Sequence, residues 1–276
     1  MREPKLITAS RHAVLLAFVA ISVYPALNVF TISLRPGNRL RSTDLAIIPA
    51  DWTLVSYVQL FTEQPFLRWL ANSLLVAALV TITGVALASI GGYAFSRFRF
   101  VGRKATMLAI LTTQMFPATM LLLPLYIVIA KLGLVNTYLG LMAFYTSTAL
   151  PFCVWQMKGF YDTIPASLEE AARIDGCSRA QAFWSVILPL ATPGLVITAL
   201  FSFMTAWSEY IVAAQVMQDE EMFTLPLGIK SFQASLSSQW GLYAAASILV
   251  SLPVVVVFLV LSKYLVSGLT LGSVKE

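Results

Sequence analysis

Long hydrophobic segments separated by short polar ones run along most of this 276-residue chain. A helix needs about 20 mostly apolar residues to cross the hydrocarbon core of a bilayer. Six segments of that length carry at most one charged residue each; they are 13–34, 70–95, 105–130, 138–157, 193–216 and 242–265. The pattern therefore predicts an all-α polytopic membrane protein with six transmembrane helices, which form a single domain over residues 1–276.

Several of these segments contain proline: Pro25, Pro117, Pro124 and Pro253. Proline removes a backbone hydrogen bond from a helix, but neighbouring helices can satisfy the freed carbonyls in a membrane bundle. Two readings remain open, because proline is common in membrane helices and because kinked helices can also enclose a cavity. Gln114 and Thr119 lie close to two of the prolines, which favours a kink in the segment 105–130.

Composition supports the membrane assignment and excludes several functional classes. The chain is 58% hydrophobic and 11% charged, with a mean hydropathy of +0.80, whereas globular domains carry roughly 25% charged residues. The basic residues are interleaved with apolar segments, so the net charge of +5 does not indicate nucleic-acid binding. With one histidine and no phosphate-binding G-x-x-x-x-G-K-[ST] loop, we expect no metal site, no bound cofactor and no enzymatic activity.

The distribution of Lys and Arg predicts the orientation of the chain, because these residues concentrate in cytoplasmic loops. If both termini are cytoplasmic, twelve of the 18 basic residues lie inside and six outside. The densest short loop, which runs from Arg97 to Lys104, then also lies inside. The charge pattern thus predicts two cytoplasmic termini and a 35-residue cytoplasmic loop at 158–192.

This loop is patterned rather than disordered: KGFYDTIPASLEEAARIDGCSRAQAFWSVILPLAT. Ser167 and Glu170 fit a capping box at the start of a short helix over 168–175, which Gly176 would end. Ser178 would cap a second helix that runs toward Pro189. Interfacial helices on the membrane are one reading, but the acidic balance of the loop is unsuited to anionic lipid. We therefore expect a protein partner at the corner between the two helices.

The loop resembles the EAA signature of permease subunits of binding-protein-dependent ABC importers. Glu170-Ala171-Ala172 is followed at the family's spacing by Gly176 and by Val186-Ile187-Leu188-Pro189, in which valine replaces an isoleucine. The resemblance extends to further segments and is strongest to the maltose/maltodextrin permeases of the carbohydrate-uptake branch. These segments are Gly92-Tyr93-Ala94-Phe95 with Arg97 and Phe100, Gln114-Met115-Phe116-Pro117, Trp155 to Gly159, and Gly268-Leu269-Thr270.

The resemblance implies a transport subunit in the bacterial cytoplasmic (inner) membrane. Its expected partners are membrane lipid, a second homologous permease subunit, an extracytoplasmic sugar-binding protein and two ATPase subunits, which would hold ATP and Mg. The EAA helix would dock into the ATPase, and the tail 272–276 would reach the ATPase interface. The residues expected to couple the two are Glu169, Glu170, Ala171, Ala172, Asp175, Gly176 and Pro189.

Two further sets of residues are candidates for contact with the cargo and its carrier. Glu209 is the only acid inside a hydrophobic segment, and with Ser208 and Gln114 it is a candidate for the translocation path. Alternatively, Glu209 pairs with a polar group of the second permease. The polar loop 218–241 would contact the binding protein through Ser235, Ser237, Ser238 and Gln239, or it is a plain surface loop.

The favoured function is import of maltose or maltodextrin. The same role for another carbohydrate, such as trehalose or glycerol 3-phosphate, is an alternative because the branch shares these motifs. An ion-coupled secondary transporter is an alternative of a different class. It would need a relay of ionisable groups in the membrane, and only Glu209 qualifies.

Overall fold

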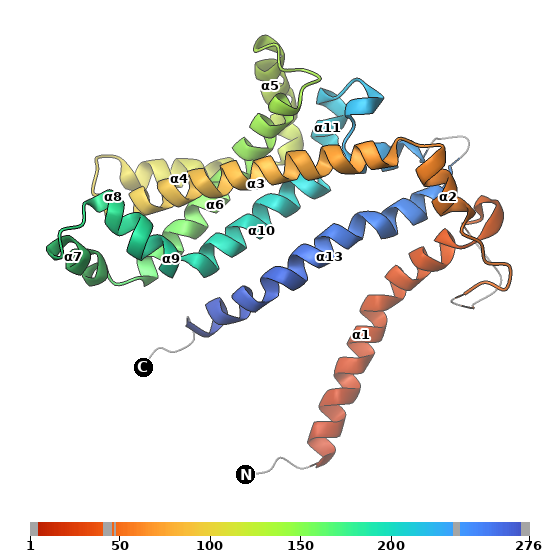
Figure 1. Cartoon of the computed structure of the whole chain (residues 1–276), viewed down its shortest axis with the longest axis horizontal. Coiled ribbons are helices and arrows are strands. Elements are labelled where there is room, and N and C mark those ends of the chain that lie inside the picture. Colours follow the sequence, from red (N-terminus) through yellow and green to blue (C-terminus); the bar gives the residue numbers. More distant parts are fainter. Residues whose placement is uncertain (1–4, 41–45, 47, 234–237, 272–276) are drawn as a thin grey trace. The chain divides into compact units, whose positions relative to one another are not determined.

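The computed structural model of the chain describes residues 5–40, 46, 48–233 and 238–271 (Figure 1). All regular elements in these ranges are helices, which confirms the all-α prediction. The α-helices are α1 (Lys5–Ser33), α2 (Val55–Thr62), α3 (Phe66–Arg97), α4 (Arg103–Thr113), α5 (Ala118–Lys131), α6 (Tyr138–Thr163), α7 (Ala166–Ile174), α8 (Arg179–Ala182), α9 (Leu188–Leu190), α10 (Thr192–Ser208), α11 (Ile211–Val216), α12 (Leu225–Ser231) and α13 (Trp240–Leu271). Short 3-10 turns at Pro36–Asn38 and Glu220–Met222 and a π-helical turn at Phe183–Ile187 complete the set.

The chain divides into two compact units. The first unit comprises Met1–Leu67 and Gly228–Leu252, and the second comprises Arg68–Leu227 and Pro253–Glu276. Within the first unit, α1 leaves its hydrophobic side chains uncovered, and Leu16 and Ile21 are 68% and 70% exposed. A helix that is apolar all round and uncovered by its own chain requires lipid or another protein around it.

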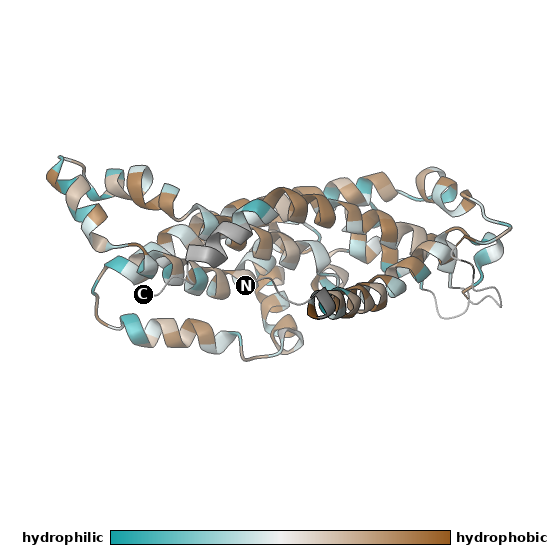
Figure 2. Cartoon of the chain, turned by 90° about the horizontal axis from the view of Figure 1, so that it is seen from below, coloured by the Kyte–Doolittle hydropathy of each residue, from teal (hydrophilic) through white to brown (hydrophobic). Residues whose placement is uncertain are grey.

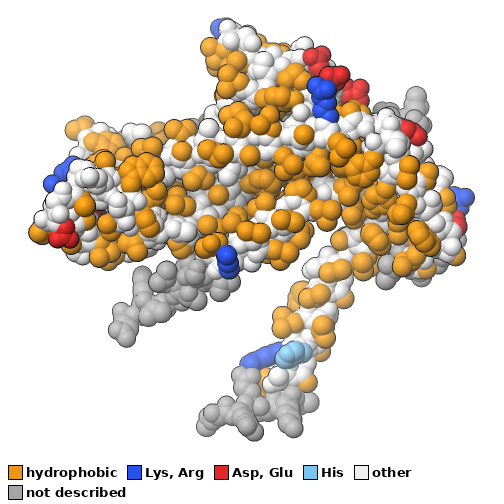
Figure 3. Space-filling view, viewed as in Figure 1, with side chains coloured by type: hydrophobic (Ala, Val, Ile, Leu, Met, Phe, Trp, Pro, Cys, Tyr) orange, Lys and Arg blue, Asp and Glu red, His pale blue; other side chains and the backbone are white. Residues whose placement is uncertain are grey.

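Hydrophobic residues run along the long helices, and hydrophilic residues gather in the turns between them (Figure 2). Hydrophobic side chains are also spread over much of the visible surface, where Lys, Arg, Asp and Glu are sparse (Figure 3). Such a surface is suited to the hydrocarbon core of a bilayer and not to water.

Among the described residues, three helical segments are long and apolar enough to cross a membrane: Ile7–Ser33, Phe66–Arg97 and Trp240–Tyr264. A fourth crossing is possible if Arg179–Leu190 and Thr192–Ser208, which meet at 77°, are counted as one broken span. The other segments expected to span the membrane are shorter, interrupted or less apolar. Length and hydropathy of the helices thus support three or four of the six expected spans.

Two of the segments expected to span the membrane are not single continuous helices. The segment 105–130 is divided into α4 and α5 at 114–117, because Pro117 takes an extended backbone conformation ahead of α5. The segment 193–216 is divided into α10 and α11, because Glu209 is extended. By contrast α6 runs six residues beyond the expected end at 157, to Thr163.

The core of the second unit lies where α3, α6, α10 and the π-helical turn meet. Met157, Tyr161 and Ile187 are fully buried in it, and Cys153 is buried among them. A Cβ atom added to Gly92 of α3 would lie 2.7 Å from Cβ of Met157 and 2.9 Å from the backbone N of Lys158. Glycine at this position therefore lets α3 approach α6 closely.

Candidate functional site

The corner predicted in the loop 158–192 is formed by α7 and α8 (Figure 1). Gly176 has a φ of +94°, in the left-handed region that favours glycine. The N–H groups of Gly176 and Cys177 donate to the carbonyl oxygens of Arg173 and Ala172 at 3.2 and 3.0 Å, and together these bonds close the end of α7 as a Schellman motif. The prediction that Gly176 ends the first helix is confirmed.

The N-terminal caps of the two helices differ from the expectation in one case. Ser178 caps α8 as predicted and shares a capping box with Gln181. Ser167 does not cap α7, because this helix already begins at Ala166, after the extended Pro165. Ser167 is therefore inside the first turn, and the predicted capping box between Ser167 and Glu170 is wrong.

The residues expected to couple to an ATPase lie on two faces of this region. Glu169 and Ala172 point inward, and Ala172 is 9% exposed. Exposed positions are Glu170, Ala171, Asp175, Gly176 and Pro189. The apolar Ile174 is 86% exposed at the end of α7 and Trp184 is 61% exposed beyond α8. The outward face thus combines an acid with uncovered apolar side chains, as is common where one protein docks on another.

Glu169 is held by two side chains from the end of α3. The hydroxyl of Tyr93 donates a hydrogen bond of 2.6 Å to Oε1 of Glu169, and Nε of Arg97 lies 3.4 Å from Oε2. Nη2 of Arg97 also donates to the carbonyl oxygen of Ile164 at 2.7 Å. Sequence reasoning did not assign these contacts; the only signal was that Tyr93 and Arg97 belong to a segment resembling the family.

Glu209, the candidate for the translocation path, lies at the break between α10 and α11. Its carboxylate accepts hydrogen bonds from the hydroxyl of Tyr145 at 2.9 Å and from the amide of Val212 at 3.0 Å. The carboxylate therefore caps α11 within its own chain. Ser208 and Gln114 are exposed; the Ser208 hydroxyl donates to Met204 O, and the Gln114 amide donates to Thr148 O.

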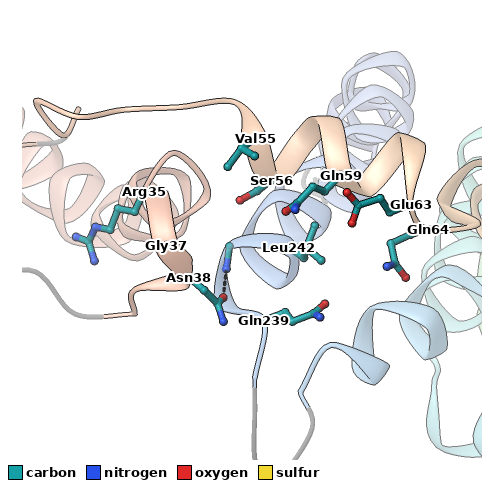
Figure 4. A pocket seen from close by; sticks show the side chains of 11 residues that line it. Arg35, Gly37, Asn38, Val55, Ser56, Gln59, Glu63, Gln64, Gln239 and Leu242 are labelled. Carbon is teal, nitrogen blue, oxygen red and sulfur yellow. Dashed lines mark hydrogen bonds between the residues drawn. The ribbon is translucent and has the colours of Figure 1, made fainter.

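The candidate contact loop for a binding protein is described only in part, since Ser235 and Ser237 lie outside the described residues. In the first unit, Nδ2 of Asn38 donates to Ser238 O at 2.6 Å. Oδ1 of Asn38 accepts from the amide of Gly241 at 3.0 Å (Figure 4). The amide of Gln239 donates to Phe232 O at 2.8 Å and closes the base of the loop.

A polar cavity of about 430 Å³ lies beside this loop base. The side chains of Gln59, Glu63 and Gln64 from the α2 region and of Gln239 from the loop face it (Figure 4). Amide and carboxylate groups that converge on one cavity can bind a polar ligand or a polar peptide segment. In the ranges described above, no group of three or more His, Cys, Asp or Glu residues could hold a metal ion.

Comparisons with known proteins agree with this arrangement. The chain matches, over residues 81–270, the family described as the binding-protein-dependent transport system inner membrane component. The diacetylchitobiose uptake system permease protein DasC of Streptomyces coelicolor is 35% identical over 92% of each chain. The maltose/maltodextrin transport system permease protein MalG of Escherichia coli K12 is 37% identical over 96% of this chain and 94% of that protein.

A solved structure is similar over nearly the whole length. It is the crystal structure of a bacterial ABC transporter involved in the import of the acidic polysaccharide alginate. One of its chains matches with a TM-score of 0.82 and 25% identity, covering 96% of this chain and 98% of that one. The helical arrangement of this chain is thus that of an ABC importer permease.

The family match confirms several expectations at once. It describes a non-catalytic, multi-pass membrane component, so the predicted transport subunit without enzymatic activity or cofactor is confirmed. A binding-protein-dependent ABC transporter also requires a binding protein and ATPase subunits as partners. The chain belongs to the family of inner membrane components of binding-protein-dependent transport systems.

Proposed function

We propose that this chain is a permease subunit of an ABC importer for a sugar or oligosaccharide, with maltose or maltodextrin as the favoured cargo. The observation that carries the proposal is the corner of α7 and α8, with Gly176 in the left-handed conformation and Glu170 exposed in the signature. The names of the relatives support a saccharide, since DasC takes up diacetylchitobiose and MalG maltose or maltodextrin. Diacetylchitobiose, trehalose and glycerol 3-phosphate are the competing cargoes.

In the proposed complex, α7 is the coupling helix. Its outward face, with Glu170 and Ile174, docks into an ATPase subunit. Asp175 and Gly176 shape the corner beside it, and the exposed Pro189 follows on α9. A second homologous permease and a second ATPase subunit complete the transporter, and the ATPase subunits hold ATP and Mg. ATP can change the conformation of the helix bundle only through contacts that differ between its two conformations. The contact of α7 with the ATPase subunit must therefore differ between them.

We also propose that the chain crosses the membrane six times with both termini in the cytoplasm, as one permease domain. Long helices provide some of the crossings, and the broken pairs α4–α5 and α10–α11 contribute to the others. Broken helices are tolerated in a membrane where protein or a polar cavity satisfies the freed backbone groups. The hydrogen bond from Gln114 to Thr148 O and the bonds of Glu209 are consistent with such support.

The proposed passage and the contact with the carrier follow from the exposed polar groups. Ser208 and Gln114 line the translocation path, and Glu209 fixes the break in the helix beside them. The loop that ends at Ser238 and Gln239 contacts the sugar-binding protein, with Asn38 holding its base in position. An anchored base restricts the loop before contact, which lowers the entropy cost of binding.

The test is reconstitution of the complex in proteoliposomes with its binding protein, loaded in turn with maltose, maltotriose, diacetylchitobiose, trehalose or glycerol 3-phosphate. We expect ATP hydrolysis to be stimulated by maltose or maltotriose. Stimulation by another saccharide alone would correct the cargo, and stimulation by no saccharide would refute the proposed function.

The coupling role of α7 is tested in the same assay with Glu170→Lys, which we expect to abolish the stimulation. The control is Val101→Lys, which adds a lysine to a fully exposed turn between α3 and α4. Full stimulation in Glu170→Lys, or equal loss in both variants, would contradict a docking contact at Glu170.

A further inference from the structure

We propose that Tyr93, Arg97 and Glu169 form a buried clamp that fastens the coupling helix α7 to the end of α3. Through this clamp, a displacement of α7 is passed directly to a membrane-spanning helix. The three residues are positioning residues for coupling. The inference rests on the proposed coupling role of α7, but the contacts themselves lie entirely within the second unit.

Two adjacent glutamates of α7 have opposite environments. Glu170 is exposed, whereas the side chain of Glu169 is 12% exposed and that of its partner Arg97 is 13% exposed. Both carboxylate oxygens of Glu169 have partners, Oε1 the hydroxyl of Tyr93 and Oε2 the guanidinium of Arg97. A partly desolvated ion pair with an added hydrogen bond is screened much less than a surface pair. Glu169 therefore faces α3, and Glu170 is left to face an ATPase.

The end of α3 also holds the connection between α6 and α7. Arg97 donates to the carbonyl oxygen of Ile164, in the short turn that joins these helices. The hydroxyl of Ser96 donates to Oδ1 of Asp162 at 2.6 Å, two residues earlier at the end of α6. Ser96 thus binds the end of α6, and Arg97 binds both the turn before α7 and α7 itself, so a tilt of α7 would strain its contacts with α3.

The second helix of the corner is attached to the same segment. The guanidinium of Arg179, at the start of α8, lies 5.7 Å from the ring centroid of Phe98 in a cation–π contact. Tyr93 additionally packs against Phe183 with ring centroids 4.6 Å apart. Both sides of the corner therefore contact residues 93–98, which makes the end of α3 a common support.

Close packing of α3 against α6 makes these contacts possible. Gly92 precedes Tyr93, and a Cβ atom there would collide with Met157 and Lys158 of α6. Because Gly92 has no side chain, the backbone of α3 lies close to the end of α6. The side chains of Tyr93, Ser96 and Arg97 can therefore reach the residues that follow on the loop. The segment Gly92–Arg97, which the sequence offered only as a family resemblance, thereby acquires a mechanical role.

The experiment uses the complete reconstituted complex and measures basal and binding-protein-stimulated ATP hydrolysis, together with transport of the stimulating saccharide per ATP. The variants are Glu169→Gln, Arg97→Gln and their combination. The matched control is Arg68→Gln, which removes the exposed Arg68–Glu221 pair, whose side chains are 58% and 71% exposed. Assembly is checked by copurification of the ATPase subunits.

We expect each clamp variant to assemble and to keep its basal hydrolysis, but to lose stimulation by about fivefold or more, the lower range of coupling between sites. The double variant should lose no more stimulation than the more impaired of the two single variants, because the two residues act as one unit. Arg97→Lys, which keeps the charge, should recover part of the transport per ATP. Arg68→Gln should behave as wild type.

Stimulation and transport per ATP at wild-type levels in Glu169→Gln and Arg97→Gln would overturn the clamp. So would additive losses in the double variant, which indicate two independent contacts. Loss of assembly would also count against it, because the residues would then support folding or docking rather than transmission. If the wild-type complex itself showed no stimulation by any loaded binding protein, the proposed function would fail instead, and this is measured first.

Discussion

Glu209 illustrates how one side chain can support a helix break. Its carboxylate joins the start of α11 to Tyr145 of α6, whose side chain is almost fully buried. Replacing Glu209 by Ala removes this acceptor, so the hydroxyl of Tyr145 and the amide of Val212 lose their partner. We expect a loss of stability of about 2 kcal/mol, since bonds to a charged acceptor and helix caps each contribute on that order.

The measurement is the thermal unfolding midpoint of the purified protein in detergent. Ser208→Ala is the matched control, because the adjacent hydroxyl is exposed and bonds to Met204 O of its own helix. Surface changes of this kind alter stability by about 0.5 kcal/mol or less. Equal midpoints for Glu209→Ala and Ser208→Ala would show that the cap contributes nothing.

Local signals in the sequence predicted the parts of the site that depend on neighbouring residues, but not the contacts between distant ones. Gly176 and Ser178 were predicted correctly because a helix end is determined by residues within one turn. Ser167 fitted the same kind of pattern, but its predicted role as a cap is wrong. The pattern does not specify at which residue the helix begins, and α7 begins one residue earlier, at Ala166. The pairing of Tyr93 with Glu169 joins residues 76 positions apart, which no local pattern can specify.

At the scale of elements, the close approach of α3 and α6 depends on Gly92. A Cβ atom there would lie 2.7 Å from Cβ of Met157, closer than real side chains pack. Gly92→Ala should therefore force the helices apart and cost about 1–3 kcal/mol, as overpacked cores do. Gly159→Ala on α6 is the control, because nothing lies within 4 Å of the added atom.

The alanine at position 159 should leave stability unchanged or raise it by about 0.5 kcal/mol, since glycine is unfavourable inside a helix. Both variants are compared by their thermal unfolding midpoints in the same detergent. A midpoint of Gly92→Ala at or above that of Gly159→Ala would mean that the two helices can separate without loss.

Prolines show why helix breaks were only partly predictable. Pro25, Pro124, Pro151 and Pro253 all lie inside continuous helices. Pro117 alone, among the prolines noted in the hydrophobic segments, coincides with a break, and there the chain forms a turn at 114–116 before it. Whether a proline bends or ends a helix depends on which neighbours satisfy the freed carbonyls, and this is tertiary information.

At the scale of the whole molecule, the proposed topology rests on the excess of Lys and Arg that it assigns to one side of the membrane. The proposed orientation places the turn at 98–102 in the cytoplasm and the segment that begins at Gln218 outside. Val101 and Gln218 are both exposed, so a cysteine at either position can react with a thiol reagent. The chain has two cysteines, Cys153 and Cys177, which are replaced by serine beforehand.

With a membrane-impermeant maleimide, we expect Gln218→Cys to be labelled in cells whose cytoplasmic membrane is intact and whose outer membrane face the reagent can reach. Val101→Cys should be labelled only after the membrane is opened, because the charged turn that holds it is retained inside. Opened membranes provide the control that both thiols are reactive. The opposite labelling pattern would show that the topology is the reverse of the proposed one. Because α7 would then lie outside, where no ATP is available, it would also contradict the proposed docking of α7 on an ATPase. Orientation is thus the property on which the proposed docking of α7 and the proposed contact with the carrier both depend.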